Sequence, residues 1–387
     1  MPWKTTQTMD QKVQFISDWK AGAYSKIDLS NKYDISRPTV DKWILRYEEE
    51  GIDGLKERSR APNSCPHKTS DKIIDLIVSE KLKNVKRGPK KIIAKLKRQY
   101  PEIIWPAPST AGEWLKKHNL IKKRKKRHHV APYLEPFKQC TKPNAVWSAD
   151  FKGQFHTKDG NVCYPLTISD NYSRYLLRCR GLKGPRYYQT KVVFESAFKE
   201  YGLPDAIRTD NGIPFAYMSI GGLSYLSIWW VLLGIVPERI NKGCPEENGR
   251  HERMHRTLKE EALNPIAKTL KEQQLEFERF KIAYNSERPH EALNQKYPSE
   301  YYKISERSYP KRLKKPEYDT VTEVRRVTRN GHFMFKNHDF FISKLLGGYA
   351  IGLKEVADGY WQIYFSFQPI GLIDIRKERI INKICRK

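Results

Sequence analysis

Three acidic residues lie where a fold could bring carboxylates together. Asp150 falls inside an apolar, strand-like run beside Phe151, where a carboxylate is costly to bury unless it is paired or binds a metal. Asp210 ends a second short apolar run, and Glu252 falls in the first turn of a helix predicted over residues 249–263. Three carboxylates that meet in space can hold two hard cations about 4 Å apart, and such a pair can activate a water or a 3′-hydroxyl for in-line displacement at phosphorus.

Each acid also has an ordinary structural interpretation. Asp210 can cap a turn through Asn211 and Gly212, and Glu252 can be a helix-start acid that the helix dipole favours. Spacing alone also leaves Glu246 and Glu247 as rivals for the third ligand position. The catalytic interpretation therefore depends on the three acids occurring together.

A competing motif overlaps the third acid. Residues 251–255 read His-Glu-Arg-Met-His, which matches the H-E-x-x-H pattern of zinc peptidases and places both imidazoles on one helix face. Four flanking cations favour a phosphate backbone over Zn²⁺, and a peptidase would leave the basic ends of the chain unexplained. These cations are Arg250, Arg253, Arg256 and Lys259.

In combination, the motifs resemble those of a known family. Residues 147–150 (WSAD), 208–212 (RTDNG) and 248–253 (NGRHER) are similar to the retroviral-integrase catalytic core used by bacterial insertion-sequence transposases. The tail 284–293 (YNSERPHEAL) is also typical of those enzymes, and the stretch 51–60 is similar to the end of their helix-turn-helix module. Because a helix-turn-helix precedes the core, where a retroviral integrase carries a His/Cys zinc module, the insertion-sequence enzymes fit better.

The resemblance implies that Asp150, Asp210 and Glu252 are the catalytic residues and metal ligands of an RNase H-like domain. They would bind two Mg²⁺ ions, for which Mn²⁺ can substitute. Glu252 is preferred to its rivals because it follows the Asn-Gly pair as in the family. The 41 residues between Asp210 and Glu252 exceed the usual integrase spacing, and the stretch 217–227, rich in Gly and Ser, is the expected place for the extra loop.

The activity implied by the resemblance is that of a DDE transposase. Such an enzyme binds double-stranded DNA at the terminal inverted repeats of its element, hydrolyses a phosphodiester to free a 3′-OH, and transfers that end into target DNA. A homo-oligomer, at least a dimer, is expected in the synaptic complex. The residues expected to seat the DNA end are Asn248, Arg250, Arg253, Arg256 and Lys259. The alternative is a catalytically inactive DNA-binding regulator derived from a transposase.

The charge of the chain also favours a nucleic-acid partner. Its 387 residues carry a net charge of +28, and releasing the counterions of a polyanion favours binding to it. Residues 1–140 hold 31 basic against 16 acidic residues, residues 141–309 hold 25 against 20, and residues 310–387 hold 16 against 8. Two basic ends therefore flank a nearly neutral middle. This layout suits a catalytic domain that lies between two nucleic-acid-binding regions.

Several features that would indicate another class of protein are missing from the sequence. Its first residues lack the apolar stretch of a signal peptide, and the longest apolar run, 228–236, is far short of the ~20 residues of a membrane-spanning helix. Six scattered cysteines without a CxxC pair indicate neither a disulfide framework nor a cysteine-rich zinc site. We therefore expect a cytoplasmic protein that is associated with no membrane, and the resemblance implies a bacterial protein associated with the nucleoid.

Residues 1–60 are expected to form a helix-turn-helix DNA-binding domain. Ser25 and Ser36 can cap its second and third helices, and Pro38 fits the first turn of the third. Apolar residues at 40, 43, 44 and 47 of that helix follow the spacing of one buried face. Its other face presents side chains that can reach base edges and phosphates, namely Arg37, Thr39, Lys42 and Arg46.

Residues 66–130 are expected to form a second helical, winged-helix-like DNA-binding domain with a basic linker. Gly88 and Pro89 open one of its helices, and Ser109 can cap another. The segment ends in six consecutive cations that can track a phosphate backbone. They are Lys122, Lys123, Arg124, Lys125, Lys126 and Arg127.

The rest of the chain changes pattern twice. Residues 140–304 mix strand and helix patterns, as the RNase H-like core implied by the resemblance would require. Residues 318–387 are expected to form five or six short strands, with a hairpin signal at Asn330-Gly331, and to close as a small SH3-like β-barrel. The expected fold is therefore multidomain, with N-terminal all-α helix-turn-helix units, a central α/β core and a C-terminal barrel.

Overall fold

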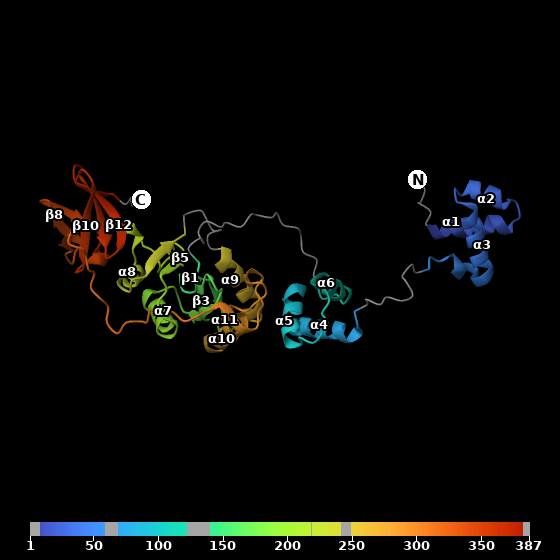
Figure 1. Cartoon of the computed structure of the whole chain (residues 1–387), viewed down its shortest axis with the longest axis horizontal. Coiled ribbons are helices and arrows are strands. Elements are labelled where there is room, and N and C mark those ends of the chain that lie inside the picture. The colour runs from blue at the N-terminus through green and yellow to red at the C-terminus, as the bar shows by residue number, and fades with distance from the viewer. Residues whose placement is uncertain (1–7, 59–68, 122–139, 218, 241–248, 382–387) are drawn as a thin grey trace. The chain divides into compact units, whose positions relative to one another are not determined.

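The computed structural model describes residues 8–58, 69–121, 140–217, 219–240 and 249–381 (Figure 1). The chain divides into two compact units, Met1–Lys68 and Thr69–Lys387. Among the described helices, none combines the length and the apolar character that crossing a bilayer requires.

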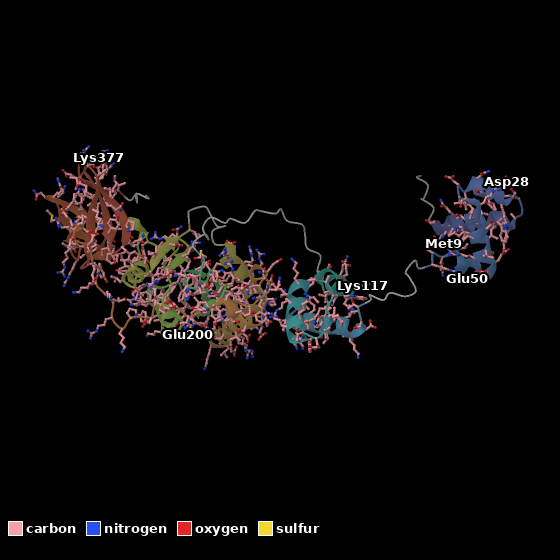
Figure 2. The ribbon with its side chains drawn as sticks, viewed as in Figure 1. Met9, Asp28, Glu50, Lys117, Glu200 and Lys377 are labelled. Carbon is pink, nitrogen blue, oxygen red and sulfur yellow. The ribbon has the colours of Figure 1, made fainter. Side chains whose placement is uncertain are left out.

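The first unit is a three-helix bundle, formed by α1 (Thr8–Lys20), α2 (Lys26–Lys32) and α3 (Arg37–Glu50), followed by the 3-10 turn η1 (Gly51–Leu55). Figure 2 shows Met9, Asp28 and Glu50 on its three helices. The helices close around a core to which each contributes. The buried members of that core are Phe15, Ile16, Leu29, Val40, Trp43, Ile44 and Leu55.

The predicted caps of this unit are only partly correct. Ser25 caps α2 in a capping box, in which its side chain accepts from the backbone of Asp28 and the Asp28 carboxylate accepts in return. Ser36 holds the N-cap position of α3, but its hydroxyl pairs with the hydroxyl of Thr39 at 2.8 Å and makes no cap hydrogen bond. The predicted buried face of α3 is confirmed.

The second unit begins with three helices, α4 (Asp71–Lys83), α5 (Pro89–Gln99) and α6 (Pro108–Lys117). Gly88 is the N-cap of α5, as predicted. The prediction that Ser109 caps the third helix is wrong, because α6 starts one residue earlier, at Pro108, whose fixed φ suits a first helical position. Residues 69–121 contain no strand that would form a wing.

A six-stranded mixed sheet forms the centre of the second unit. Its strands are β1 (Val146–Phe151), β2 (Phe155–His156), β3 (Val162–Asp170), β4 (Leu176–Leu182), β5 (Ala206–Thr209) and β6 (Val236–Arg239). The order is β2-β3-β1-β5-β6, with β4 also paired to β3. β1 runs antiparallel to β3 and parallel to β5, so β1 joins the antiparallel and the parallel halves of the sheet.

Five helices accompany this sheet, α7 (Tyr187–Tyr201), α8 (Tyr225–Leu232), α9 (Gly249–Ala262), α10 (Leu270–Ser286) and α11 (Pro298–Tyr301). The side chains of α7 and α8 share one buried cluster with Trp147 and Ala149 of β1. The side chains of α9 and α10 share a second cluster with Cys163 and Cys179 of β3 and β4. Because alternate strand residues point to opposite faces, Ser148 and Asp150 lie on the face opposite Trp147 and Ala149.

The C-terminal part is antiparallel. Its strands are β7 (Glu323–Arg326), β8 (His332–Phe335), β9 (His338–Phe341), β10 (Ala350–Ala357), β11 (Tyr360–Phe365), β12 (Gln368–Asp374) and β13 (Arg379–Ile381). Five of them form a sheet in the order β13-β12-β11-β10-β7, and β8 pairs with β9. A turn does close at the predicted Asn330-Gly331, where the backbone N–H of Gly331 donates to the Thr328 oxygen at 2.9 Å, but it makes no β7–β8 hairpin, since β7 pairs with β10. A two-residue hairpin turn lies at Lys336-Asn337 between β8 and β9, where both residues have positive φ.

The long segment between Asp210 and Glu252 connects the C-terminal sheet to the core. Ile220, Leu223, Ile228 and Val231 belong to the buried cluster of the C-terminal strands. A Cβ at Gly371 of β12 would lie 2.5 Å from the side chain of Ile220, so a larger residue there would displace Ile220. The expected extra loop at 217–227 therefore supplies the turn Ile220–Gly222 and the start of α8.

One prediction concerns the stability of the first unit. Leu29→Ala should lower the free energy of unfolding of this unit by about 2–5 kcal/mol, because Leu29 is fully buried and its removal leaves a cavity. Ile27→Ala, on the same helix but 48% exposed, is the matched control and should change it by less than about 1 kcal/mol. Thermal unfolding followed by circular dichroism measures both, and equal losses would contradict the assigned core.

Candidate active site

Asp150 and Asp210 occupy equivalent positions on neighbouring parallel strands. Val146, Trp147 and Ser148 of β1 pair with Ala206, Ile207 and Arg208 of β5. Asp150 lies two residues after Ser148, and Asp210 lies two residues after Arg208, directly beyond the end of β5. By alternation both belong to the face of Ser148 and Arg208, and both are half-buried. Asp150 near the end of β1 and Asp210 directly after β5 therefore lie toward the same end of these two parallel strands.

Helix α9, which carries Glu252, packs on that same face through two histidines. His251 and His255 are one turn apart and are 2% and 6% exposed. The Nε2 atoms of both rings lie 2.7 Å from the hydroxyl of Thr167, which pairs with Asp150 across the β1–β3 ladder. His251 Nδ1 also lies 3.2 Å from the hydroxyl of Ser169. These polar contacts fix α9 against the strands beside Asp150.

The environment of these histidines keeps them neutral. Burial lowers the pKa of His251 to about 3. Burial, and after it the neighbouring His251 and Lys152, lower the pKa of His255 to about 2. A neutral imidazole keeps one lone pair, which is the form that accepts hydrogen bonds and binds metals.

Asp210 sits in a turn that the following residues shape. Its Oδ1 accepts a hydrogen bond from the backbone N–H of Gly212 at 3.1 Å. A Cβ at Gly212 would lie 3.0 Å from the Asp210 carboxylate, so glycine permits this close approach. Asn211 donates to the carbonyl oxygen of Ile240 at 3.0 Å, which ties the turn to the end of β6. The turn-capping interpretation of Asp210 is therefore correct, and it orients the carboxylate at the end of β5.

The three predicted acids are not all gathered into one tight group. Among the described residues, the one group of His, Cys, Asp and Glu side chains with ligand atoms within 4.8 Å of one another is Asp150, His251 and His255. His255 Nδ1 lies 3.9 Å from Asp150 Oδ2. Glu252 is exposed on α9, on the flank next to His255. Its rivals Glu246 and Glu247 lie outside the described residues, as does Asn248.

The cations expected to contact DNA around Glu252 divide into two sets. Arg253, Arg256 and Lys259 are exposed on the outer face of α9. Arg250 is turned toward the protein, where it donates to the carbonyl oxygen of Asn171 at 3.1 Å. Burial, with Arg174 next, lowers the pKa of Arg250 to about 10. Arg250 therefore holds the start of α9, which differs from the expected DNA contact.

The basic residues expected in the helical regions are only partly described. In α3, Arg37 and Lys42 are exposed, whereas Thr39 and Arg46 are half-buried. The cationic groups of Lys42 and Arg46 lie 5.3 and 5.1 Å from the centre of the Trp43 ring. The six consecutive cations from Lys122 to Arg127 lie outside the described residues.

Sequence reasoning missed the residues that hold the site together. Thr167 and Ser169, two apart in β3, present hydroxyls to the histidines of α9. Their signal was the alternation of polar side chains with Leu166 and Ile168 in an otherwise buried strand. Arg208 was also missed as a structural residue, and it donates two hydrogen bonds to Glu238 on the neighbouring strand β6.

The tail motif at 284–293 contacts α9 through an ion pair. Arg288 pairs with Glu261 of α9, and both groups are largely buried. The side chain of Asn285 makes two hydrogen bonds, at 2.8 and 2.9 Å, to the backbone of Leu176 in β4. The tail therefore joins α9, α10 and the sheet (Figure 1).

Models of known protein families match several parts of this chain. Models of an "integrase core domain" match residues 140–228 and 233–298, and a model of the "IS481 family transposase, C-terminal domain" matches residues 322–381. In these parts the chain is similar to insertion-sequence transposases with an integrase core. A "helix-turn-helix domain" model matches residues 11–63, and a "homeodomain-like domain" model matches residues 39–115. These matches agree with the N-terminal helical regions, the central mixed α/β core and the C-terminal antiparallel sheet of the structure.

Two curated relatives illustrate the family. The "Insertion element IS407 uncharacterized 31.7 kDa protein" of Burkholderia multivorans is 28% identical over 185 residues, covering 47% of this chain. The "Transposase for transposon Tn552" of Staphylococcus aureus is 26% identical over 238 residues, covering 53% of this chain. The matches span 63% and 47% of these relatives' own lengths, so the chain covers less than two thirds of either.

Solved structures of viral integrases are also similar to this chain. The HTLV-2 integrase catalytic core domain, solved with magnesium, is 17% identical with a TM-score of 0.34, covering 42% of this chain and 99% of its own. The simian T-cell lymphotropic virus intasome, in complex with a PP2A regulatory subunit, is 18% identical with a TM-score of 0.36. The match covers 71% of this chain and 97% of the intasome chain.

The tail motif generates a prediction about acid stability. Burial, followed by the charges of Lys91 and Arg288, lowers the pKa of His290 to about 3 in the folded chain. Because the unfolded state binds this proton near pH 6.5 and the folded state does not, stability is lost as pH falls below about 6.5. The slope from this residue is up to about 1.4 kcal/mol per pH unit.

Urea denaturation between about pH 7 and pH 5 measures this slope. His290→Asn should make the free energy of unfolding less dependent on pH, whereas His118→Asn, exposed after the end of α6, should leave the dependence unchanged. An unaltered slope in His290→Asn would show that this histidine is not held neutral by the fold.

Proposed function

We propose that the chain is a DDE transposase that frees a 3′-OH at the ends of its element and transfers it into target DNA. The observation that carries the proposal is the pairing of β1 with β5. If this register is extended by two residues beyond Ser148 and Arg208, Asp150 and Asp210 correspond to each other, and the helix of Glu252 packs beside Asp150 through Thr167. The core would thus act as a polynucleotidyl transferase.

The residues present suit divalent cations. Carboxylate oxygens are the preferred ligands of Mg²⁺, and Mn²⁺ accepts the same set. Asp150, Asp210 and Glu252 would hold two such ions, Glu252 through a side chain that is exposed on α9 and has room to turn. When bound, the ions would supply positive charge that activates a water or a 3′-hydroxyl and stabilises the leaving oxygen.

The remaining groups of the site position the DNA and the acids. Arg253, Arg256 and Lys259 lie on the outer face of α9, where their charges can contact the phosphates of a DNA end beside Glu252. Arg250 holds the first turn of α9 to the loop after β3 through Asn171. The Thr167 hydroxyl holds the helix one turn later.

We assign DNA recognition to the helical regions, as helix-turn-helix domains over about 1–60 and 66–130, with terminal inverted repeats as the sequence read. The linker cations Lys122–Arg127 and Asn248 would add backbone contacts. The core would span about 140–304. The strands over 318–387 would close as a small SH3-like barrel, because Phe333, Phe335 and Phe340 of β8 and β9 share a core with the five-stranded sheet. Joining two ends requires at least a dimer.

The catalytic assignment predicts that removing any one acid abolishes cutting. Asp150→Asn, Asp210→Asn and Glu252→Gln should each lose end cleavage and strand transfer with Mg²⁺ or Mn²⁺ by at least about 10³-fold, because each removes a charge that the ions need. Binding to element ends, measured by gel shift, should survive.

Asp205 and Glu260 provide matched controls, as Asp205→Asn and Glu260→Gln. Asp205 directly precedes β5, at the end opposite Asp210, and Glu260 lies on α9 two turns after Glu252. Both should keep cleavage. Retained cutting in one acid variant would remove that residue from the site. If the unaltered chain binds ends but neither cuts nor transfers them, the chain is a DNA-binding regulator and the enzyme proposal fails.

The recognition helix generates a second prediction. Arg37→Ala or Lys42→Ala should weaken specific end binding by about 1–3 kcal/mol, because both side chains are exposed on α3 and can reach bases or phosphates. Lys56→Ala, an exposed lysine outside this helix that pairs with Asp53, should leave the affinity unchanged. Fluorescence anisotropy with specific and scrambled DNA duplexes measures the affinity of each variant. Equal affinities for all variants would place recognition elsewhere.

A further inference from the structure

The contacts around Thr167 define one consistent placement of hydrogens on the two buried histidines. The Thr167 hydroxyl has one hydrogen, which it can donate to the backbone oxygen of Asp150 at 3.1 Å. Its two lone pairs then accept from His251 Nε2 and His255 Nε2, both at 2.7 Å. In this arrangement each ring carries its hydrogen on Nε2 and keeps its lone pair on Nδ1.

The two Nδ1 atoms face different partners. His251 Nδ1 lies 3.2 Å from Ser169 Oγ, a hydroxyl that can donate to it. His255 Nδ1 lies 3.9 Å from Asp150 Oδ2, a carboxylate oxygen that has no hydrogen to give. This separation is too long for a hydrogen bond. Two acceptors that approach each other in a largely buried place are a setting for a cation.

The spacing fits one ion held by both atoms. Oxygen and imidazole nitrogen ligands lie about 2.0–2.2 Å from a divalent transition metal, so two ligands of one ion are at most about 4.2 Å apart. Asp150, His251 and His255 also form the group of ligand atoms within 4.8 Å that the described residues contain. The distance between Asp150 Oδ2 and His255 Nδ1, 3.9 Å, is below the limit of about 4.2 Å for two ligands of one ion.

We propose that His255 is a nitrogen ligand of the metal ion that Asp150 holds. This rests on the proposed function, since it adds a ligand to one ion of that site. A site with this histidine ligand differs from an all-carboxylate site in the metal ion that it prefers. An imidazole nitrogen favours first-row transition ions over Mg²⁺, which prefers oxygen ligands and dehydrates reluctantly. The ion at Asp150 is therefore one for which Mn²⁺ or Co²⁺ is bound more tightly than Mg²⁺.

The test is pulsed electron paramagnetic resonance of the full chain loaded with Mn²⁺, since a directly bound nitrogen couples to the manganese electrons. Unaltered protein with ¹⁵N-labelled histidine should show histidine nitrogen coupling. His255→Asn should lose the coupling, and its preference for Co²⁺ over Mg²⁺ in competition titrations should fall at least about tenfold. His251→Asn, the matched buried histidine on the same helix face, should keep the coupling.

Each result bears on one of the two proposals. Bound Mn²⁺ without histidine coupling in the unaltered chain, or coupling that persists in His255→Asn, overturns the His255 ligand and leaves the transposase proposal intact. Loss of coupling in His251→Asn with retention in His255→Asn also overturns it. If Asp150→Asn binds Mn²⁺ as well as the unaltered chain does, the metal site of the proposed function is itself wrong. The labelled unaltered chain gives a decisive result even if a variant does not fold.

Discussion

The contact between Thr167 and the two histidines of α9 is the interaction on which the geometry of the candidate site depends. It joins the helix that carries Glu252 to the strand that pairs with Asp150, inside an interface where Thr167 is fully buried. A buried hydroxyl or imidazole without a partner costs about 1–3 kcal/mol, so the three groups hold one relative position. A slip of α9 by one turn would break all of these bonds together.

The apolar contacts of α9 act in the same direction. Met254, Leu258 and Ala262 continue the buried face of the helix toward its end and pack with Phe277 and Phe280 of α10. Polar contacts therefore fix the register at the end near Asp150, while apolar contacts fill the far end. The exposed face is left to Glu252 and to the cations Arg253, Arg256 and Lys259. One helix thus presents an acid and its expected DNA contacts together.

The segment between Asp210 and Glu252 has a structural task beyond linking two acids. It supplies α8 to the main core through Trp229 and Trp230, and it supplies Ile220 and Leu223 to the core of the C-terminal sheet. Its unusual length is explained by these two sets of contacts. The C-terminal sheet is consequently packed against the part of the chain that follows Asp210.

Several features of this protein were determined by its sequence alone, because they arise from neighbouring residues. The helix face at 40–47, the Ser25 cap and the order of strands and helices in the core follow from local spacing, and the three acids lie in motifs that resemble those of a known family. Local signals failed where a partner far along the chain decided the outcome. Strand β7 pairs with β10, which is distant in the sequence, and does not pair with β8, the strand directly after Asn330-Gly331. Asp150 meets His255, 105 residues away, and Arg250 turns inward to Asn171, because only the folded sheet brings these groups within reach.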